Sequence, residues 1–85
     1  MRIDKYLKVS RILKRRTIAK ELADNQRLMI NERIAKAGSE VSIGDILTIT
    51  FGKRILKIKI TEIREFTKKE DSESMYEVIS ESIKE

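Results

Sequence analysis

The stretch RILKRRTIAKELADNQRLMIN, residues 11–31, decides the fold because the spacing of its apolar residues changes partway along it. Spacings of three and four predict an amphipathic helix from about Arg15 to Asp24, and RLMIN, residues 27–31, predicts a short strand. Asn25 is expected to end the helix in the left-handed conformation that Asn tolerates. The apolar side of this helix is formed by Ile18, Ala19, Leu22 and Ala23. The chain therefore changes from helix to strand within these residues.

A second amphipathic helix is expected before this stretch. Its apolar side consists of Ile3, Tyr6, Leu7, Val9 and Leu13, which recur at helical spacing. Lys5, Lys8 and Arg11 follow one another at intervals of three on the opposite side. Packing both apolar sides against a sheet leaves the basic sides of the two helices facing water.

Strands are expected to follow. After residue 31 the sequence indicates a turn and a brief return strand over residues 34–36, and Gly44 places another turn. ILTITF, residues 46–51, alternates, and Gly52 with Lys53 suits a two-residue hairpin. In RILKIKITEI, residues 54–63, Leu56, Ile58 and Ile60 point inward. The expected fold class is α+β, with two N-terminal helices packed on a small antiparallel sheet of three to five strands.

The end of the chain returns to helical spacing, with Met75, Val78, Ile79 and Ile83 on one stripe. Two capping boxes, Thr67 with Glu70 and Ser74 with Glu77, offer alternative starts. A C-terminal helix is therefore expected from roughly residue 68 to 82. The organisation predicted is one domain over residues 1–65, followed by an acidic helical tail over 66–85.

Composition excludes several function classes. The 85 residues include no Cys and no His, which removes disulfides, thiolate nucleophiles, imidazole bases and the usual zinc ligands. No nucleophile has a base beside it to activate it, so no enzyme activity, cofactor or metal is expected. No apolar run approaches the ~20 residues of a membrane span, nor does a secretion signal open the chain. A cytoplasmic protein is expected.

The charge is distributed unevenly. Residues 1–61 carry 15 Lys or Arg against 6 Asp or Glu, whereas residues 62–85 carry 4 against 8. A basic body suggests a polyanionic partner, and charge alone would also fit an acidic membrane surface.

Lys14, Arg15 and Arg16 concentrate positive charge where the second helix begins. Cations at a helix start oppose its dipole, while the free N–H groups of that first turn favour an anion, so the arrangement suits bound phosphate. The alternative is a merely solvated basic surface. Tyr6 and Phe51 are expected in the core rather than stacked on bases, and Lys57 and Lys59 are expected to discourage pairing at a sheet edge.

Two segments, RIDKYLKVSRILKRRTIAKELADNQRLMIN (residues 2–31) and AKAGSEVSIGDILTI (residues 35–49), resemble the S4 RNA-binding domain, first seen in the fourth protein of the small ribosomal subunit. The resemblance covers about residues 1–50. The positions that carry it are Arg2, Ile3, Asp4, Lys5, Arg15, Arg16, Ala19, Leu22, Asn31, Lys36, Gly44 and Asp45. Glu32 stands where the family has the Gly of an Asn-Gly turn, so a looser loop is expected there.

The stretches LKVSR, KRRT, AKE, TKKE and MYE are similar to stand-alone members of this family that act in ribosome-associated quality control. A more distant likeness is to the small heat-shock protein that binds freed large ribosomal subunits. The resemblance implies binding to a stalled large subunit that still holds peptidyl-tRNA. The implied partners are ribosomal RNA, tRNA and a tRNA-recruiting quality-control factor that extends the nascent chain with alanine.

The leading hypothesis is a non-enzymatic, monomeric RNA clamp that needs no membrane. The residues expected to neutralise phosphates are Arg2, Lys5, Arg15, Arg16 and Lys20, with Asn31 and Lys36 approaching from the adjacent strands and Lys8, Arg11 and Lys14 at the rim. Two alternatives remain: an adaptor that docks a partner protein through its C-terminal helix, and a DNA-binding helical pair, for which the connection between the helices is long and lacks the usual Gly.

Overall fold

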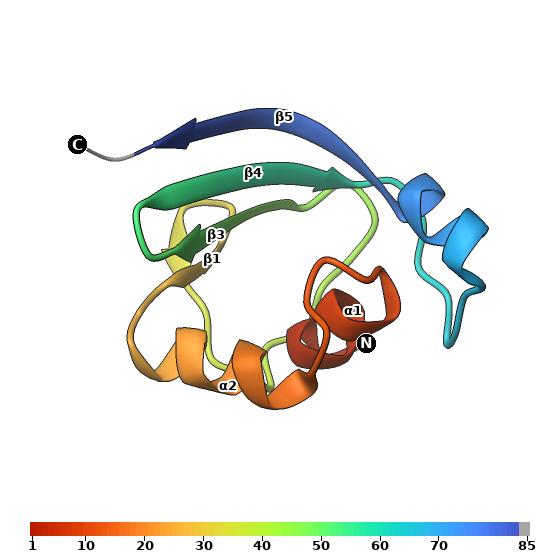
Figure 1. The fold of residues 1–85 in the computed structure, drawn as a ribbon. Coiled ribbons are helices and arrows are strands. Elements are labelled where there is room, and N and C mark those ends of the chain that lie inside the picture. The colour runs from red at the N-terminus through yellow and green to blue at the C-terminus, as the bar shows by residue number, and fades with distance from the viewer. Residues whose placement is uncertain (84–85) are drawn as a thin grey trace.

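Two short helices lie against one side of a curved sheet in the computed structural model, which describes residues 1–83 (Figure 1). Helix α1 spans Ile3–Val9 and helix α2 spans Arg16–Asp24. The α1 helix is shorter than its apolar spacing suggests, because the chain turns at Arg11, whose φ is 63°. Leu13 lies beyond the helix but is still buried. The two-helix prediction is confirmed.

The sheet has five strands in the order β2-β1-β3-β4-β5, and every neighbouring pair is antiparallel. In chain order the strands are β1 (Leu28–Ile30), β2 (Arg33–Ile34), β3 (Ile46–Phe51), β4 (Arg54–Ile60) and β5 (Tyr76–Ile83). A 3-10 helix, η1 (Lys69–Met75), comes directly before β5. The expected α+β class is confirmed, and the five strands are the upper limit of the predicted three to five.

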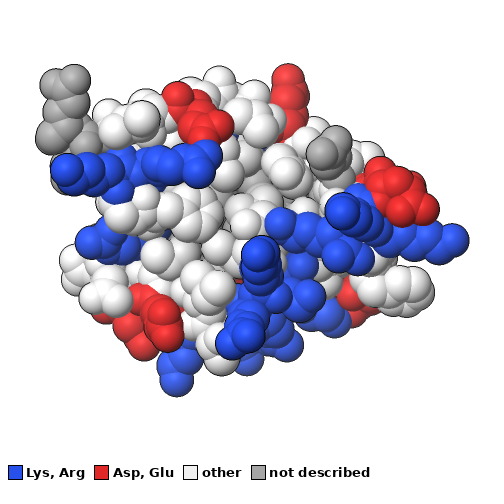
Figure 2. All heavy atoms as spheres, in the orientation of Figure 1, with Lys and Arg blue, Asp and Glu red and all other residues white. Residues whose placement is uncertain are grey.

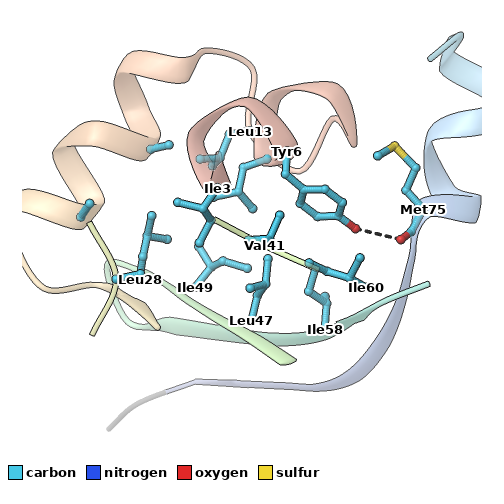
Figure 3. Close-up of a cluster of buried hydrophobic side chains, with 14 residues drawn as sticks. Ile3, Tyr6, Leu13, Leu28, Val41, Leu47, Ile49, Ile58, Ile60 and Met75 are labelled. Atoms are coloured by element: carbon cyan, nitrogen blue, oxygen red, sulfur yellow. Dashed lines mark hydrogen bonds between the residues drawn. The ribbon is translucent and has the colours of Figure 1, made fainter. Parts of the chain in front are cut away.

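The core lies between the helices and the sheet (Figure 3). Its fully buried side chains include Ile3, Tyr6, Leu7, Leu28, Leu47, Ile49, Ile58 and Ile60. The Tyr6 hydroxyl donates a hydrogen bond of 2.8 Å to the carbonyl oxygen of Met75. Because that carbonyl also accepts from the N–H groups of Thr61 and Glu62, it fastens the junction of η1 and β5 to α1. Tyr6 is therefore a core residue, as expected.

The predicted C-terminal helix is wrong, because residues 76–83 form β5 and pair with β4. Pairing gives the backbone of β4 hydrogen-bond partners along its second edge. A register shift opposite Lys57 and Ile58 inserts one extra residue, Ile79, into β5. The extra residue interrupts the alternation that is typical of a strand. As a result Val78, Ile79 and Ile83 have the spacing of apolar residues on one side of a helix. Residues 84 and 85 of the predicted tail lie outside the described residues.

Two smaller expectations about turns are also wrong. Asn25 has φ −98° and the left-handed residue after α2 is Gln26, with φ 59°. Asn31 and Glu32 have φ 49° and 69°, so the β1–β2 connection is a tight two-residue hairpin rather than a looser loop. The tight turn is retained because the Asn31 side chain is held by hydrogen bonds to Asp45 and Ile46. No helix among the described residues has the length and apolar character needed to cross a membrane.

Candidate RNA interface

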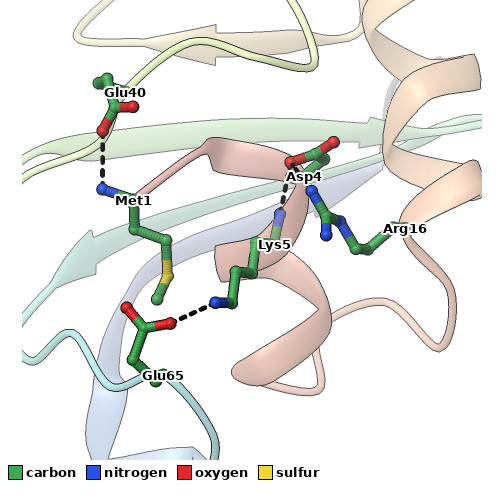
Figure 4. Close-up of polar contacts among 6 residues, drawn as sticks. All are labelled: Met1, Asp4, Lys5, Arg16, Glu40 and Glu65. Carbon is green, nitrogen blue, oxygen red and sulfur yellow. Dashed lines mark hydrogen bonds and ion pairs between the residues drawn. The ribbon is translucent and has the colours of Figure 1, made fainter.

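One buried carboxylate joins the beginnings of the two helices. Asp4 is 6% exposed, and its two oxygens accept hydrogen bonds from Arg2 Nη2 at 3.2 Å and from Arg16 Nη2 at 3.1 Å. The backbone N–H of Lys5 donates to Asp4 Oδ1 at 2.7 Å. Figure 4 shows Arg16 reaching from α2 toward Asp4 on α1. The helix-start carboxylate therefore holds two guanidinium groups from different helices close together.

The loop of residues 36–40 borders Arg2. The N–H groups of Ile3 and Asp4 donate to the carbonyl oxygens of Ser39 and Ala37, at 2.7 and 3.2 Å. The Arg2 guanidinium lies against Gly38, where a Cβ would stand 3.5 Å from Arg2 Nη2. The N–H groups in the first turn of α1 are thus satisfied by carbonyl oxygens of the protein itself. At this helix start an anion would therefore be bound by guanidinium groups and not by the backbone.

The start of α2 is different. Its N-cap residue, Arg15, makes no side-chain cap, and neither Arg16 nor Thr17 has a hydrogen-bond partner for its backbone N–H among the described residues. Arg15, Arg16 and Thr17 are all exposed. Free N–H groups and the positive end of the helix dipole therefore lie next to two guanidinium groups, an arrangement that favours phosphate.

Further exposed cations are Lys8 in the last turn of α1 and Arg11 and Lys14 in the loop between the helices. Arg11 Nη2 donates to the carbonyl oxygen of Thr67 at 3.3 Å, and the Thr67 hydroxyl donates to that of Val9 at 2.7 Å. The segment before η1 is thereby fastened to the end of α1. Among the described side chains, no carboxylate pairs with Lys8, Lys14, Arg15 or Lys20.

Lys5 is partly neutralised. Its ammonium group forms an ion pair with Glu65 (Figure 4), and this hydrogen bond and charge lower the pKa of Glu65. Among the described side chains, two carboxylates, Asp4 and Glu65, form ion pairs with the predicted cations of the two helices and their loop. These cations number eight: Arg2, Lys5, Lys8, Arg11, Lys14, Arg15, Arg16 and Lys20. Positive charge remains in clear excess.

The two site residues predicted on the strands differ in placement. Lys36 is exposed and adjoins Ala37, whose carbonyl oxygen accepts from the N–H of Asp4, so it lies near the start of α1. Asn31 is exposed, but its amide is occupied: Oδ1 accepts from the N–H of Ile46 at 2.9 Å, and Nδ2 donates to Asp45 Oδ1 at 3.0 Å. The structure therefore gives Asn31 a structural contact and does not bring its side chain to the arginines.

Figure 2 shows how these charges are arranged on one face of the molecule. Lys and Arg atoms gather over its lower centre and right, where Figure 1 places α1, the following loop and the beginning of α2. Acidic atoms lie mainly toward the margins of this face. We call the set Arg2, Lys5, Lys8, Arg11, Lys14, Arg15, Arg16, Lys20 and Lys36 the basic surface.

Sequence reasoning missed two supporting residues. Gly38 lies beside the Arg2 guanidinium, and Asp45 orients Asn31 and also accepts from the N–H of Ser42 at 2.8 Å. The Gly-Ser and Gly-Asp pairs in these segments signal turns, but spacing along the chain does not say which residue a turn approaches. No group of three or more acidic side chains that could hold a metal ion occurs in the described residues.

Comparisons with known proteins identify relatives of this chain. The S4 domain family matches residues 1–47. An RQC P-site tRNA stabilizing factor of Streptococcus pneumoniae is 51% identical over 82 residues, which cover 96% of this chain and 93% of the relative. The protein of the same name from Bacillus subtilis is 49% identical over 81 residues, covering 95% and 94%.

A more distant relative of that name, from Helicobacter pylori, is 35% identical over 63 residues, covering 74% of this chain and 75% of the relative. Among solved structures, the trimeric structure of Vibrio cholerae Heat Shock Protein 15 matches with a TM-score of 0.85 and 25% identity. The match covers 94% of this chain and 82% of the other.

Proposed function

We propose the function of this chain from one premise: it belongs to the S4-domain proteins, within the group of the RQC P-site tRNA stabilizing factors. It is an RNA-binding protein of ribosome-associated quality control. More specifically, it binds tRNA and ribosomal RNA of the large subunit after a stall, and so supports a tRNA-recruiting factor that adds alanine to the nascent chain. It acts by binding rather than by catalysis, as a monomer, in the cytoplasm.

The observation that carries this proposal is the pair of guanidinium groups held by Asp4 beside the uncapped start of α2. Structured RNA is bound largely through its phosphates and its shape, and arginine offers paired donors for phosphate oxygens. Holding Arg2 and Arg16 in place before RNA arrives lowers the entropy lost on binding. The remaining exposed cations extend the contact along the backbone of the RNA.

The experiment is sedimentation of the full chain with purified large subunits that carry peptidyl-tRNA. Wild-type protein is expected to travel with the subunits. A variant with Lys14→Ala and Arg15→Ala, which removes two unpaired charges of the basic surface, is expected to stay near the top of the gradient. The matched control is Lys53→Ala with Lys59→Ala, which removes two exposed charges from β4 and its hairpin. Equal retention of both variants would contradict the proposal.

A second candidate function is an adaptor for a partner protein, favoured by the exposed apolar side chains of β5, where Val78 is 53% and Ile79 is 49% exposed. Deleting residues 66–85 would not test it cleanly, since it would strip β5 from β4. Val78→Thr with Ile79→Thr keeps β-branched residues in the strand. If these substitutions abolish association with the subunit while tRNA binding persists, the adaptor function is supported.

A further inference from the structure

A hollow opens on the helix side of the sheet, next to the basic surface. It has a volume of about 390 Å³ and is lined by Arg11, Ile12, Phe51, Arg54, Leu56 and Tyr76. These residues come from the loop between the helices, from β3 and β4, and from the first position of β5. Figure 2 shows an uncharged area in the middle of this face with basic atoms on both sides of it.

The floor of the hollow is apolar and partly aromatic. Leu56 points to the same face as the buried Ile58, because the two are separated by two positions on β4. Phe51 pairs with Arg54 at the beginning of β4, and Tyr76 pairs with Ile60 at its end. Arg54 and Ile60 are six positions apart on β4, which corresponds to about 20 Å of strand. Both aromatic rings are only half-buried, so they offer surface to a ligand.

Two arginines stand at the rim. Arg11 is exposed on the loop between the helices and is steadied by its hydrogen bond to the carbonyl oxygen of Thr67. Arg54 is exposed at the start of β4 and forms an ion pair with Glu81. The hollow therefore combines an aromatic and aliphatic floor with guanidinium groups at its edge. That chemistry fits a planar ring joined to a phosphate.

Arg11 belongs to both the hollow and the basic surface, so an RNA backbone on the basic surface passes beside the opening. Unpaired bases in RNA loops commonly stack on aromatic side chains or on arginine planes. The volume lies near the lower end of the range for small-ligand pockets, ~300–1,000 Å³. This size suits one base with its sugar better than a folded segment of another protein.

We propose that this hollow accepts one unstacked nucleotide of the bound RNA, with the base on the floor formed by Phe51, Leu56 and Tyr76 and the phosphate at Arg11. This inference rests on the proposed RNA-binding function and names a second contact for that RNA. Arg54 lies at the other end of the floor and orients the base or the next phosphate.

The test is an NMR titration of the ¹⁵N-labelled full chain with adenosine 5′-monophosphate, and separately with ribose 5-phosphate, which lacks the base. The nucleotide is expected to shift the amides of Ile12, Phe51 and Leu56 in a saturable way. Ribose 5-phosphate is expected to shift amides at the start of α2 and near Arg11, and to leave those of Phe51 and Leu56 unchanged. Equal effects of the two probes on the hollow would overturn the proposal.

Two variants sharpen the result. Phe51→Leu keeps an apolar floor but removes one ring, and is expected to weaken nucleotide binding at the hollow about fivefold or more, since stacking on one aromatic residue is worth ~1–3 kcal/mol per base. Arg54→Gln is expected to weaken binding two- to fivefold, whereas Lys53→Gln, the matched loss of charge on the neighbouring turn residue, is expected to leave it unchanged. Equal weakening by Arg54→Gln and Lys53→Gln would count against a specific site.

Binding of whole tRNA, measured on the same samples, separates this inference from the proposed function. If tRNA binds but the nucleotide does not reach the hollow, only the inference fails. If tRNA does not bind even at low salt, the proposed function fails. A hollow that responds to an acidic peptide carrying a tryptophan, and to no nucleotide, is a protein-binding site, and that outcome also overturns the proposal.

Discussion

Arg16, the first residue of α2, lies 3.1 Å from the buried carboxylate of Asp4 on α1, and the two residues are twelve positions apart in the chain. The other oxygen of the same carboxylate holds Arg2. One acidic group thus sets the spacing of two arginines that would otherwise repel each other. Asp4 is a positioning residue for the basic surface.

Replacing Asp4 by Asn is expected to change the affinity for tRNA in the direction opposite to the one that net charge predicts. Asp4→Asn adds one positive charge, so charge alone predicts tighter RNA binding. Because the carboxylate positions Arg2 and Arg16, we expect affinity for tRNA to fall instead, about fivefold. Fluorescence anisotropy with labelled tRNA measures this, and circular dichroism checks that the variant is folded. Glu21→Gln, on the exposed side of α2, is the charge-matched control and should bind slightly more tightly. Tighter binding by both variants would show that Asp4 does not position the arginines.

Arg15 and Arg16 are expected to differ in their effect on folding. Arg15→Ala removes an exposed guanidinium group without a carboxylate partner and should change the melting temperature by no more than about 2 °C. Arg16→Ala leaves the buried carboxylate with one guanidinium group, that of Arg2, and the backbone N–H of Lys5. This loss costs about 1–2 kcal/mol and lowers the melting temperature by roughly 4–16 °C. Thermal melts followed by circular dichroism measure both. Both variants should weaken tRNA binding, and equal melting temperatures would contradict the role of the Asp4 contact.

Binding should depend steeply on salt. If six phosphates are neutralised, the slope of log affinity against log salt concentration should be about −4 to −5, at ~0.7–0.9 per phosphate. Arg15→Ala should reduce the magnitude of the slope by nearly one. Titrations between about 50 and 200 mM salt measure it. A slope near zero would mean that the basic surface does not contact the RNA backbone.

Tyr6 should make the protein sensitive to alkaline pH. Burial, and to a lesser degree the nearby Tyr76, raises the pKa of Tyr6 above its ordinary value of 10.0. Below pH 10 the phenol is protonated in both folded and unfolded chains, so it does not make stability depend on pH. Above pH 10 the unfolded chain releases the proton while the folded chain retains it, and stability falls.

Tyr6→Phe removes this component of the alkaline loss. It also removes the hydrogen bond to the carbonyl of Met75, so at neutral pH it should lower stability by about 1 kcal/mol. Denaturant unfolding at pH 7 and at pH 10–11 measures both effects. If the two proteins lose equal stability between these pH values, Tyr6 does not titrate as described.

Glu32 occupies a left-handed position that glycine adopts without steric cost. Glu32→Gly should therefore stabilise the protein by about 0.5–1 kcal/mol, after the greater flexibility of glycine in the unfolded chain is deducted. The expected rise in melting temperature is roughly 2–8 °C. Lys53→Gly, at an exposed turn position outside the left-handed region, is the control and should not stabilise the protein.

The sequence determined the two helices, the alternating strands β3 and β4, and the clustering of Lys and Arg on the outer sides of the helices. Each of these features depends on how apolar and charged residues are spaced within a short segment. Burying the apolar side of such a segment stabilises the same helix or strand wherever it packs. The hairpin at Gly52 and Lys53 is equally local, because a left-handed backbone at Gly52 meets no steric cost.

Only the tertiary structure decided the rest. Val78, Ile79 and Ile83 have helical spacing, yet the exposed edge of β4 offered backbone hydrogen bonds that a separate helix could not supply, and one bulged residue reconciled the pattern with a strand. Likewise, the residues next to Asn31 in the sequence do not predict its hydrogen bond to Asp45, and those next to Arg16 do not predict its contact with Asp4. Such contacts join segments far apart in the chain, and they depend on where packing of the whole core brings those segments together.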